Sequence, residues 1–217
     1  MPQLGVCNAA GETVGEVAVS DEIFGAPMNP DLLHQAVVMA DSHRKRHAGN
    51  TKRRGDIIGS GTKIWRQKGT GRARHSDRKA PLFVGGAKAH SPHPRSGEKR
   101  MPRKMRRKAL FCALSEATRR NRVTVIENLE LERPRTKLVA DMLAALRLRP
   151  GRILMMLSEQ QVADDNVVKS CRNIANLYLR QAPHLNARDV LWADEIIFTR
   201  DALDALNRIG EEVEQDA

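Results

Sequence analysis

Hydrophobic residues recur in two stretches of the chain, one on each side of a long segment without apolar periodicity. Between residues 13 and 19, valines alternate in part with polar residues, which predicts a strand or hairpin. From Pro30, apolar residues recur at a spacing of three or four, and Asp31 follows as a favourable first-turn residue. This pattern predicts a helix that ends near residue 43.

The second stretch begins at Pro102, a residue that suits the first turn of a helix. The predicted helix runs to about residue 121, and its first half is cationic whereas its second half is apolar on one face. Strands and helices then alternate. We expect strands at residues 123–126, 153–157, 176–179 and 195–198. We expect helices from Thr136 and after Thr199 or Asp201, and a helix or turn after Ser158.

Local signals support several of these boundaries. Pro150-Gly151 ends the helix before the apolar run at 153–157, which is typical of a buried parallel strand. Ser158 and Gln161 have the spacing of a capping box. Alternating strands and helices favour an α/β fold with a mostly parallel sheet flanked by helices.

Charge divides the chain in the same way as hydrophobicity. Residues 44–108 hold 22 of the 37 Lys and Arg residues and three acidic residues, a net charge of +19, whereas the other 152 residues carry −8. The segment contains nine of the 15 glycines and few apolar residues, so we expect it not to fold alone. The prediction is a discontinuous globular domain, 1–43 and 109–217, with an extended basic internal loop, 44–108, that runs into the following helix.

A segment of this charge requires a polyanionic partner, of which nucleic acid is the commonest. Residues 59–74 combine cations that neutralise phosphates, glycines that allow close backbone approach, and an indole, Trp65, able to stack on an unpaired base. We therefore expect RNA binding by this segment.

The same residues resemble a known family. Residues 66–74, RQKGTGRAR, with Trp65 ahead of them, are similar to the central loop of the L-four family of large-subunit ribosomal proteins, in its bacterial form. The remaining matches are PLFVGG at 81–86, HPR at 93–95, PRKMRRKAL at 102–110, Pro134 with Thr136-Lys137, and Arg172-Asn173-Ile174.

This resemblance implies a structural protein of the cytoplasmic ribosome. It implies an α/β domain, a loop that penetrates 23S-type rRNA and aids subunit assembly, and contacts with other large-subunit proteins. It also implies that the loop tip lines the peptide exit tunnel, next to the nascent peptide, through Lys68, Gly69, Thr70 and Gly71. The expected RNA-binding residues are Arg44, Lys45, Arg46, Lys52, Arg53, Arg54, Lys63, Trp65, Arg66, Gln67, Lys68, Gly69, Thr70, Gly71, Arg72, Arg74, Arg78, Lys79, Arg95, Arg103, Lys104, Arg106 and Arg107.

The chain differs from the family pattern at several points. Many members have a Gly-Ser pair where this chain has His75-Ser76-Asp77. A third glycine usual after residue 86 is Ala87, and Ser91 replaces a common glycine. The usual aromatic residue around 96–99 is absent.

Other functions find less support. An α/β enzyme that clamps nucleic acid with the basic segment needs a carboxylate or histidine cluster, and none is evident, so we expect no catalytic residue. A nucleoid-type DNA binder would bind duplex DNA as well as RNA. Residues 59–63 lack the spacing of a phosphate-binding loop, and His43 and His47 lack companion ligands, so we expect no cofactor and no metal.

The sequence offers few indications of the cellular compartment. The three cysteines, Cys7, Cys112 and Cys171, form no CxxC pair, which favours a reducing compartment. No signal peptide and no membrane-spanning segment is expected.

Overall fold

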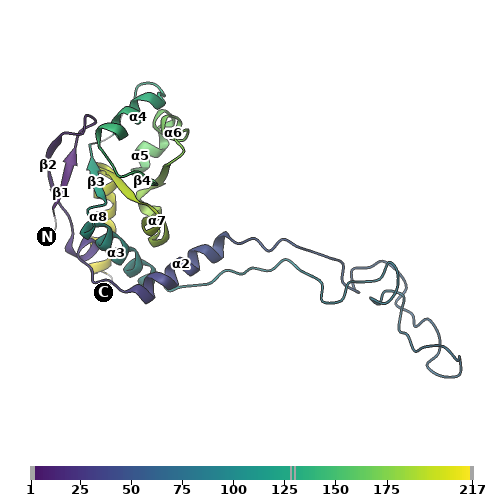
Figure 1. Cartoon of the computed structure of the whole chain (residues 1–217). Coiled ribbons are helices and arrows are strands. Elements are labelled where there is room, and N and C mark those ends of the chain that lie inside the picture. Colours follow the sequence, from purple (N-terminus) through teal and green to yellow (C-terminus); the bar gives the residue numbers. More distant parts are fainter. Residues whose placement is uncertain (1–2, 128, 130, 216–217) are drawn as a thin grey trace. The chain divides into compact units, whose positions relative to one another are not determined.

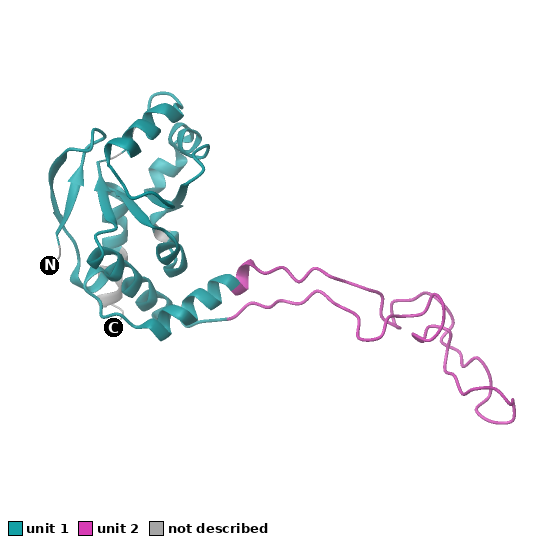
Figure 2. Cartoon of the chain, viewed as in Figure 1, with its two compact units in different colours: residues 1–41, 100–217 teal, residues 42–99 magenta. Residues whose placement is uncertain are grey.

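The computed structural model describes residues 3–127, 129 and 131–215. The chain divides into two compact units, unit 1 (residues 1–41 and 100–217) and unit 2 (residues 42–99), which Figure 2 colours separately. The sequence division extended the basic segment to residue 108. In the structure, residues 100–108 belong to unit 1, and the basic residues 103–108 form the first turns of a helix, as the sequence predicted for the end of this segment.

Unit 1 is built on a six-stranded sheet with the order β2-β1-β3-β6-β4-β5 (Figure 1). Only the β1–β2 pair is antiparallel, and the other neighbours are parallel. The prediction of a mostly parallel α/β fold is therefore confirmed. The strands are β1 (Gln3–Cys7), β2 (Thr13–Ala18), β3 (Val123–Ile126), β4 (Ile153–Leu157), β5 (Leu177–Gln181) and β6 (Glu195–Thr199).

Helices follow or connect these strands. They are α1 (Asp21–Phe24), α2 (Pro30–Arg44), α3 (Arg103–Arg119), α4 (Thr136–Ala145), α5 (Glu159–Ala163), α6 (Asp165–Cys171), the 3-10 helix η1 (Ala182–His184), α7 (Ala187–Trp192) and α8 (Arg200–Gln215). The last three residues of α2 lie in unit 2.

The sheet has a hydrophobic core on each face because successive side chains of a strand point to opposite faces. In β4, Leu154 and Met156 join a core with α1, α2, α3, α7 and α8, whereas Met155 and Leu157 join a core with α4 and α6. All four side chains are almost completely buried. This two-sided burial explains why the strand reads as an uninterrupted apolar run.

Polar side chains fix several element ends. Asn29 accepts a bond from the backbone N–H of Leu32 at the start of α2, with Oδ1 3.1 Å from N. The predicted capping box is present, with Ser158 Oγ and the Gln161 side chain bonded to each other's backbone N–H groups. Gln161 Oε1 also accepts a 2.7 Å hydrogen bond from the Thr199 hydroxyl. The capping box thereby connects the end of β4 with the end of β6.

The strong sequence patterns gave correct boundaries and the weak ones were missed. The strands at 123–126 and 153–157 and the start of α4 agree with the sequence, and the other predicted strands differ by one or two residues. The prediction omitted β1, the short helices α1 and α6, and α7. The proposed apolar stripe of the last helix includes Ile209 and Val213, whose side chains lie outside the described residues.

Candidate nucleic-acid interface

Unit 2 consists of two chain segments that run in opposite directions and are joined by a loop (Figures 1 and 2). Beyond the end of α2, its described residues form no helix or regular strand. An isolated antiparallel bridge joins His47 and Arg95, and the Thr51 N–H donates to the Pro92 carbonyl over 3.2 Å. The segments therefore pair as in a hairpin, at a few positions only.

Hydrogen bonds close the base of unit 2. Ser42 Oγ accepts from the Lys99 backbone N–H over 2.9 Å, and His43 Nε2 donates to the Lys99 carbonyl over 3.0 Å. Both ends of the unit are thus held together at the point where α2 ends.

His93 connects the two segments further along. Its Nε2 accepts from Arg53 Nε, and its Nδ1 lies 3.1 Å from Asn50 Oδ1. Because Nε2 is an acceptor, Nδ1 carries the proton and donates to Asn50. Ser91 Oγ lies 2.9 Å from Nε2, so this serine, at a position where the family often has glycine, has a hydrogen-bonding role.

An ion pair fixes the distal part of unit 2. Arg54 Nη2 lies 2.9 Å from Asp77 Oδ1 and donates to Ser76 Oγ over 2.6 Å. Asp77 is buried, with 4% of its surface exposed. The Ile64 N–H donates to the Ser76 carbonyl over 2.9 Å. Asp77 therefore neutralises Arg54 alone and leaves the other described cations of unit 2 unpaired.

The tip, residues 63–75, is held by its own side chains. Trp65 Nε1 donates to the Ala73 carbonyl over 2.9 Å, and Lys63 Nζ donates to the His75 carbonyl over 3.0 Å. Gly69 and Gly71 have φ values of +80° and +63°, a conformation that side chains disfavour. These two glycines are therefore required by the backbone path of the tip.

Two rings of the tip and one ring outside it pack edge-to-face. The Trp65 and His75 ring centroids are 5.6 Å apart, and those of His75 and Phe83 are 5.1 Å apart. Arg72 lies over the indole at 5.6 Å. Trp65 is half-buried by these contacts, so it is less available for stacking on a base than the sequence suggested. The role of His75 carried no sequence signal, because its edge-to-face contacts join residues that are separated in the chain.

The cations of unit 2 face solvent. Unit 2 has 16 Lys and Arg residues and three acidic residues. All 16 are exposed except Lys79, which is half-buried. Within the described residues, Arg54 is the single one of these cations with a carboxylate partner. Nearly all of the predicted binding cations in this unit therefore present unneutralised charge.

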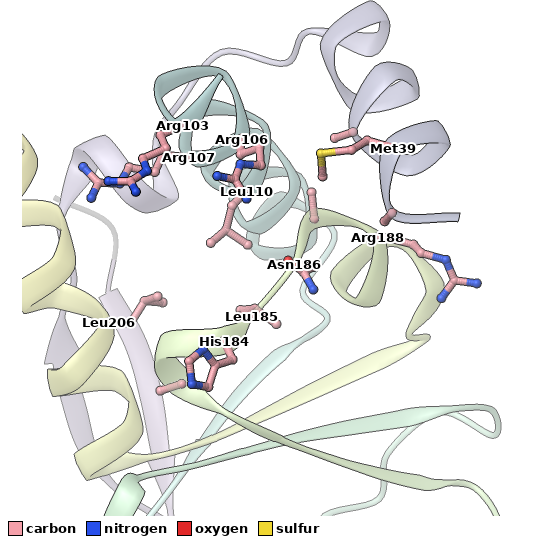
Figure 3. A pocket seen from close by; sticks show the side chains of 14 residues that line it. Met39, Arg103, Arg106, Arg107, Leu110, His184, Leu185, Asn186, Arg188 and Leu206 are labelled. Carbon is pink, nitrogen blue, oxygen red and sulfur yellow. The ribbon is translucent and has the colours of Figure 1, made fainter. Parts of the chain in front are cut away.

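The predicted residues in α3 form a separate group within unit 1. Arg103, Lys104 and Arg106 are exposed, and Arg107 is half-buried. Together with α2, the 182–188 segment and Leu206, three of these side chains line a cavity of about 790 Å³ with Leu110 (Figure 3). Arg103, Arg106 and Arg107 form no ion pair with a described carboxylate, whereas Arg188, which also lines the cavity, pairs with Asp41 and Asp189. The α3 side of the cavity is therefore cationic, and its walls are partly apolar.

Other kinds of site find no support in the described part of the chain. No group of three or more His, Cys, Asp and Glu side chains there could hold a metal ion. His43 uses Nε2 for the Lys99 carbonyl, as described above. No described helix has the length and apolar character needed to cross a membrane.

Comparison with known proteins assigns the chain to a family. Residues 17–209 match the model of the Ribosomal protein L4/L1 family. The chain is 42% identical over 203 residues to large ribosomal subunit protein uL4 of Symbiobacterium thermophilum, and equally so to that of Pelotomaculum thermopropionicum, covering 94% of this chain and 96% of each relative. Identity to the uL4 of Natranaerobius thermophilus is 35% over 209 residues, covering 96% and 99%. The match spans both units, and the chain belongs to the Ribosomal protein L4/L1 family.

Proposed function

We propose that this chain is a structural constituent of the large ribosomal subunit and binds 23S-type rRNA through unit 2 and the basic start of α3. The observation that carries the proposal is the density of exposed, carboxylate-free cations on an irregular segment. Phosphate groups supply the opposite charge at matching density, and their binding releases condensed counterions. The curated relatives, each called large ribosomal subunit protein uL4, support the same role.

The chain is not an enzyme, because the family to which it belongs is structural. The alternative of a nucleic-acid-processing enzyme with a clamping segment is therefore set aside. The proposal places the protein in the ribosome of the cytoplasm, with other large-subunit proteins as neighbours.

The two glycines of the tip support a finer proposal. Residues 68–71 line the peptide exit tunnel and contact the nascent peptide. Gly69 and Gly71 keep the backbone narrow there, while Lys68 is exposed. The hydrogen bonds of Trp65 and Lys63 within the tip hold this turn in one conformation. Binding to RNA therefore costs less conformational entropy than it would for a disordered loop.

RNA binding is tested by titrating the full chain with 23S-type rRNA at several salt concentrations. We expect log K to fall linearly with log salt, by roughly 0.7 to 0.9 for each neutralised phosphate. Competition with duplex DNA separates a ribosomal protein from a general DNA binder. A flat salt response, or equal affinity for the two nucleic acids, contradicts the proposal.

Tunnel lining needs a different measurement. Ribosomes assembled with Lys68→Cys protein, carrying a photo-crosslinker, are stalled during translation and irradiated. We expect crosslinks to the nascent peptide at this position and none from the matched variant Lys88→Cys, an exposed residue of unit 2 outside the tip. Equal crosslinking from both positions would exclude a specific role for the tip.

A further inference from the structure

Six arginines gather at one edge of the sheet in unit 1. Arg119, Arg120 and Arg122 precede β3, and Arg147, Arg149 and Arg152 precede β4. Both strands are parallel to β6, which lies between them. Parallel strands begin at the same edge, so two segments separated in sequence converge there. We call these six residues the arginine cluster.

The sequence alone does not reveal that the two arginine segments converge, whereas contacts between them in the structure establish it. Arg149 Nη2 donates to the Arg120 carbonyl over 3.5 Å, and Arg149 Nε lies 3.4 Å from Glu195 Oε1. Arg152 Nε lies 3.3 Å from Asp194 Oδ2. The start of β6 therefore supplies two carboxylates between the two arginine segments.

Glu116 and Glu195 are much less exposed than the arginines they pair with, whereas Asp194 and Arg152 are equally exposed, at 43% each. Arg120 and Arg149 have side chains 53% and 59% exposed, while their partners Glu116 and Glu195 are 17% and 5% exposed. Desolvation raises the pKa of Glu195, an effect that the charges of Arg149 and Arg122 oppose. Arg122 and Arg152 are half-buried, and Arg119 Nη2 donates to the Ala26 carbonyl over 2.7 Å. The donors that face solvent are therefore chiefly those of Arg120, Arg147 and Arg149.

The arginine cluster is a basic patch in a unit that is otherwise acidic. Three acids, Glu116, Asp194 and Glu195, form ion pairs with arginines of this cluster of six. Elsewhere in unit 1, outside residues 100–108, the sequence has nine Lys and Arg residues against 20 acidic residues. A cationic excess at this one edge is therefore a local feature and does not reflect the average composition of the unit.

Two properties of the cluster favour a phosphate-bearing ligand. All six cations are arginines, whose planar donors bind phosphate oxygens in pairs. None of the large apolar side chains exposed in the described residues belongs to these two segments, whereas a protein interface normally has an apolar centre. An RNA backbone fits such a surface better than an acidic protein segment does.

We propose that the arginine cluster is a second RNA-contact surface, which binds phosphates of ribosomal RNA independently of unit 2. The inference rests on the proposed rRNA-binding function. It is also distinct from the basic start of α3, because Arg103 and Arg119 lie at opposite ends of that helix, roughly 24 Å apart at 1.5 Å per residue.

The test compares two variants of the full chain. R120Q/R147Q removes two exposed arginines of the cluster, and R133Q/R208Q removes two exposed arginines of unit 1 outside it. Both lower the net charge from +11 to +9. With 23S-type rRNA, we expect R120Q/R147Q to reduce the salt slope by about 1.4 to 1.8 and to weaken binding about 25- to 60-fold at 0.1 M salt. R133Q/R208Q should bind as wild type does.

A second measurement uses the wild-type chain, so its result does not depend on whether the variant folds. Phenylglyoxal modifies exposed arginines, and we expect rRNA to protect Arg120 and Arg147 but not Arg133. Binding by R120Q/R147Q that equals that of the control, or unprotected cluster arginines in the complex, overturns the inference. Failure of the wild-type chain to bind rRNA would instead overturn the proposed function.

Discussion

Replacing residues 48–94 by Gly-Gly removes most of unit 2 at a point where the structure permits a short connection. His47 and Arg95 are antiparallel bridge partners, so a two-residue turn suffices to join them. Both hydrophobic cores consist of unit 1 residues, and within the removed segment Ala87 is the one apolar side chain described as buried. The body should therefore retain its fold.

The magnitude follows from loop closure. Shortening a 47-residue connection to two residues reduces the closure entropy by (3/2)RT ln(47/2), about 2.8 kcal/mol as an upper bound, since short loops deviate from this relation. For a protein of this size, about 1 kcal/mol shifts the melting temperature by about 2 to 4 °C. We expect an unchanged melting temperature or a rise of up to about 10 °C.

The same deletion should weaken RNA binding, although it leaves the stability of the body unchanged or raised. The deletion removes 11 Lys and Arg residues and two acidic residues. If all 11 cations neutralise phosphates, the log–log salt slope falls by about 8 to 10. Thermal unfolding followed by circular dichroism and rRNA titration of the same sample measure both effects. A lowered, non-cooperative melting transition would show that the body depends on unit 2, and an undiminished salt slope would show that the cations bind elsewhere.

Three smaller perturbations probe individual contacts. Ser158→Ala removes a capping box and should destabilise the chain by about 1 kcal/mol in a denaturant titration, whereas Ser158→Thr should largely restore it. Gly86→Ala places a Cβ 2.1 Å from the Ala80 carbonyl oxygen, so amide exchange around residues 80–87 should accelerate, while exchange in unit 1 stays constant. Burial raises the pKa of Cys171 to about 11, so at pH 8 this thiol should resist alkylation that half-buried Cys7 undergoes; equal labelling would contradict the burial.

Short-range patterns in the sequence were sufficient for much of the fold. Strands β3 and β4 were predicted from runs of apolar residues, and the capping box from two residues three positions apart. Those signals depend on the local chain, whose periodicity records which faces become buried. Short elements such as α1 and α6 gave too few residues to establish a period.

The candidate binding residues followed from charge in the same way. Segregation of cations into one stretch is a property of the chain itself, and it remains whatever the fold. The pairing of Arg54 with Asp77 and the edge-to-face packing of His75 between Trp65 and Phe83 were not predicted, because each joins residues that only the folded loop brings together.

The sequence by itself thus determined where the longer helices, most of the strands and the positive charge lie along the chain. The tertiary structure alone decided the strand order, which places β6 between β3 and β4 and brings Arg120 beside Arg149. The physical reason is that periodicity reports burial of one segment at a time, whereas neighbours in a sheet are chosen by packing between segments far apart in the chain.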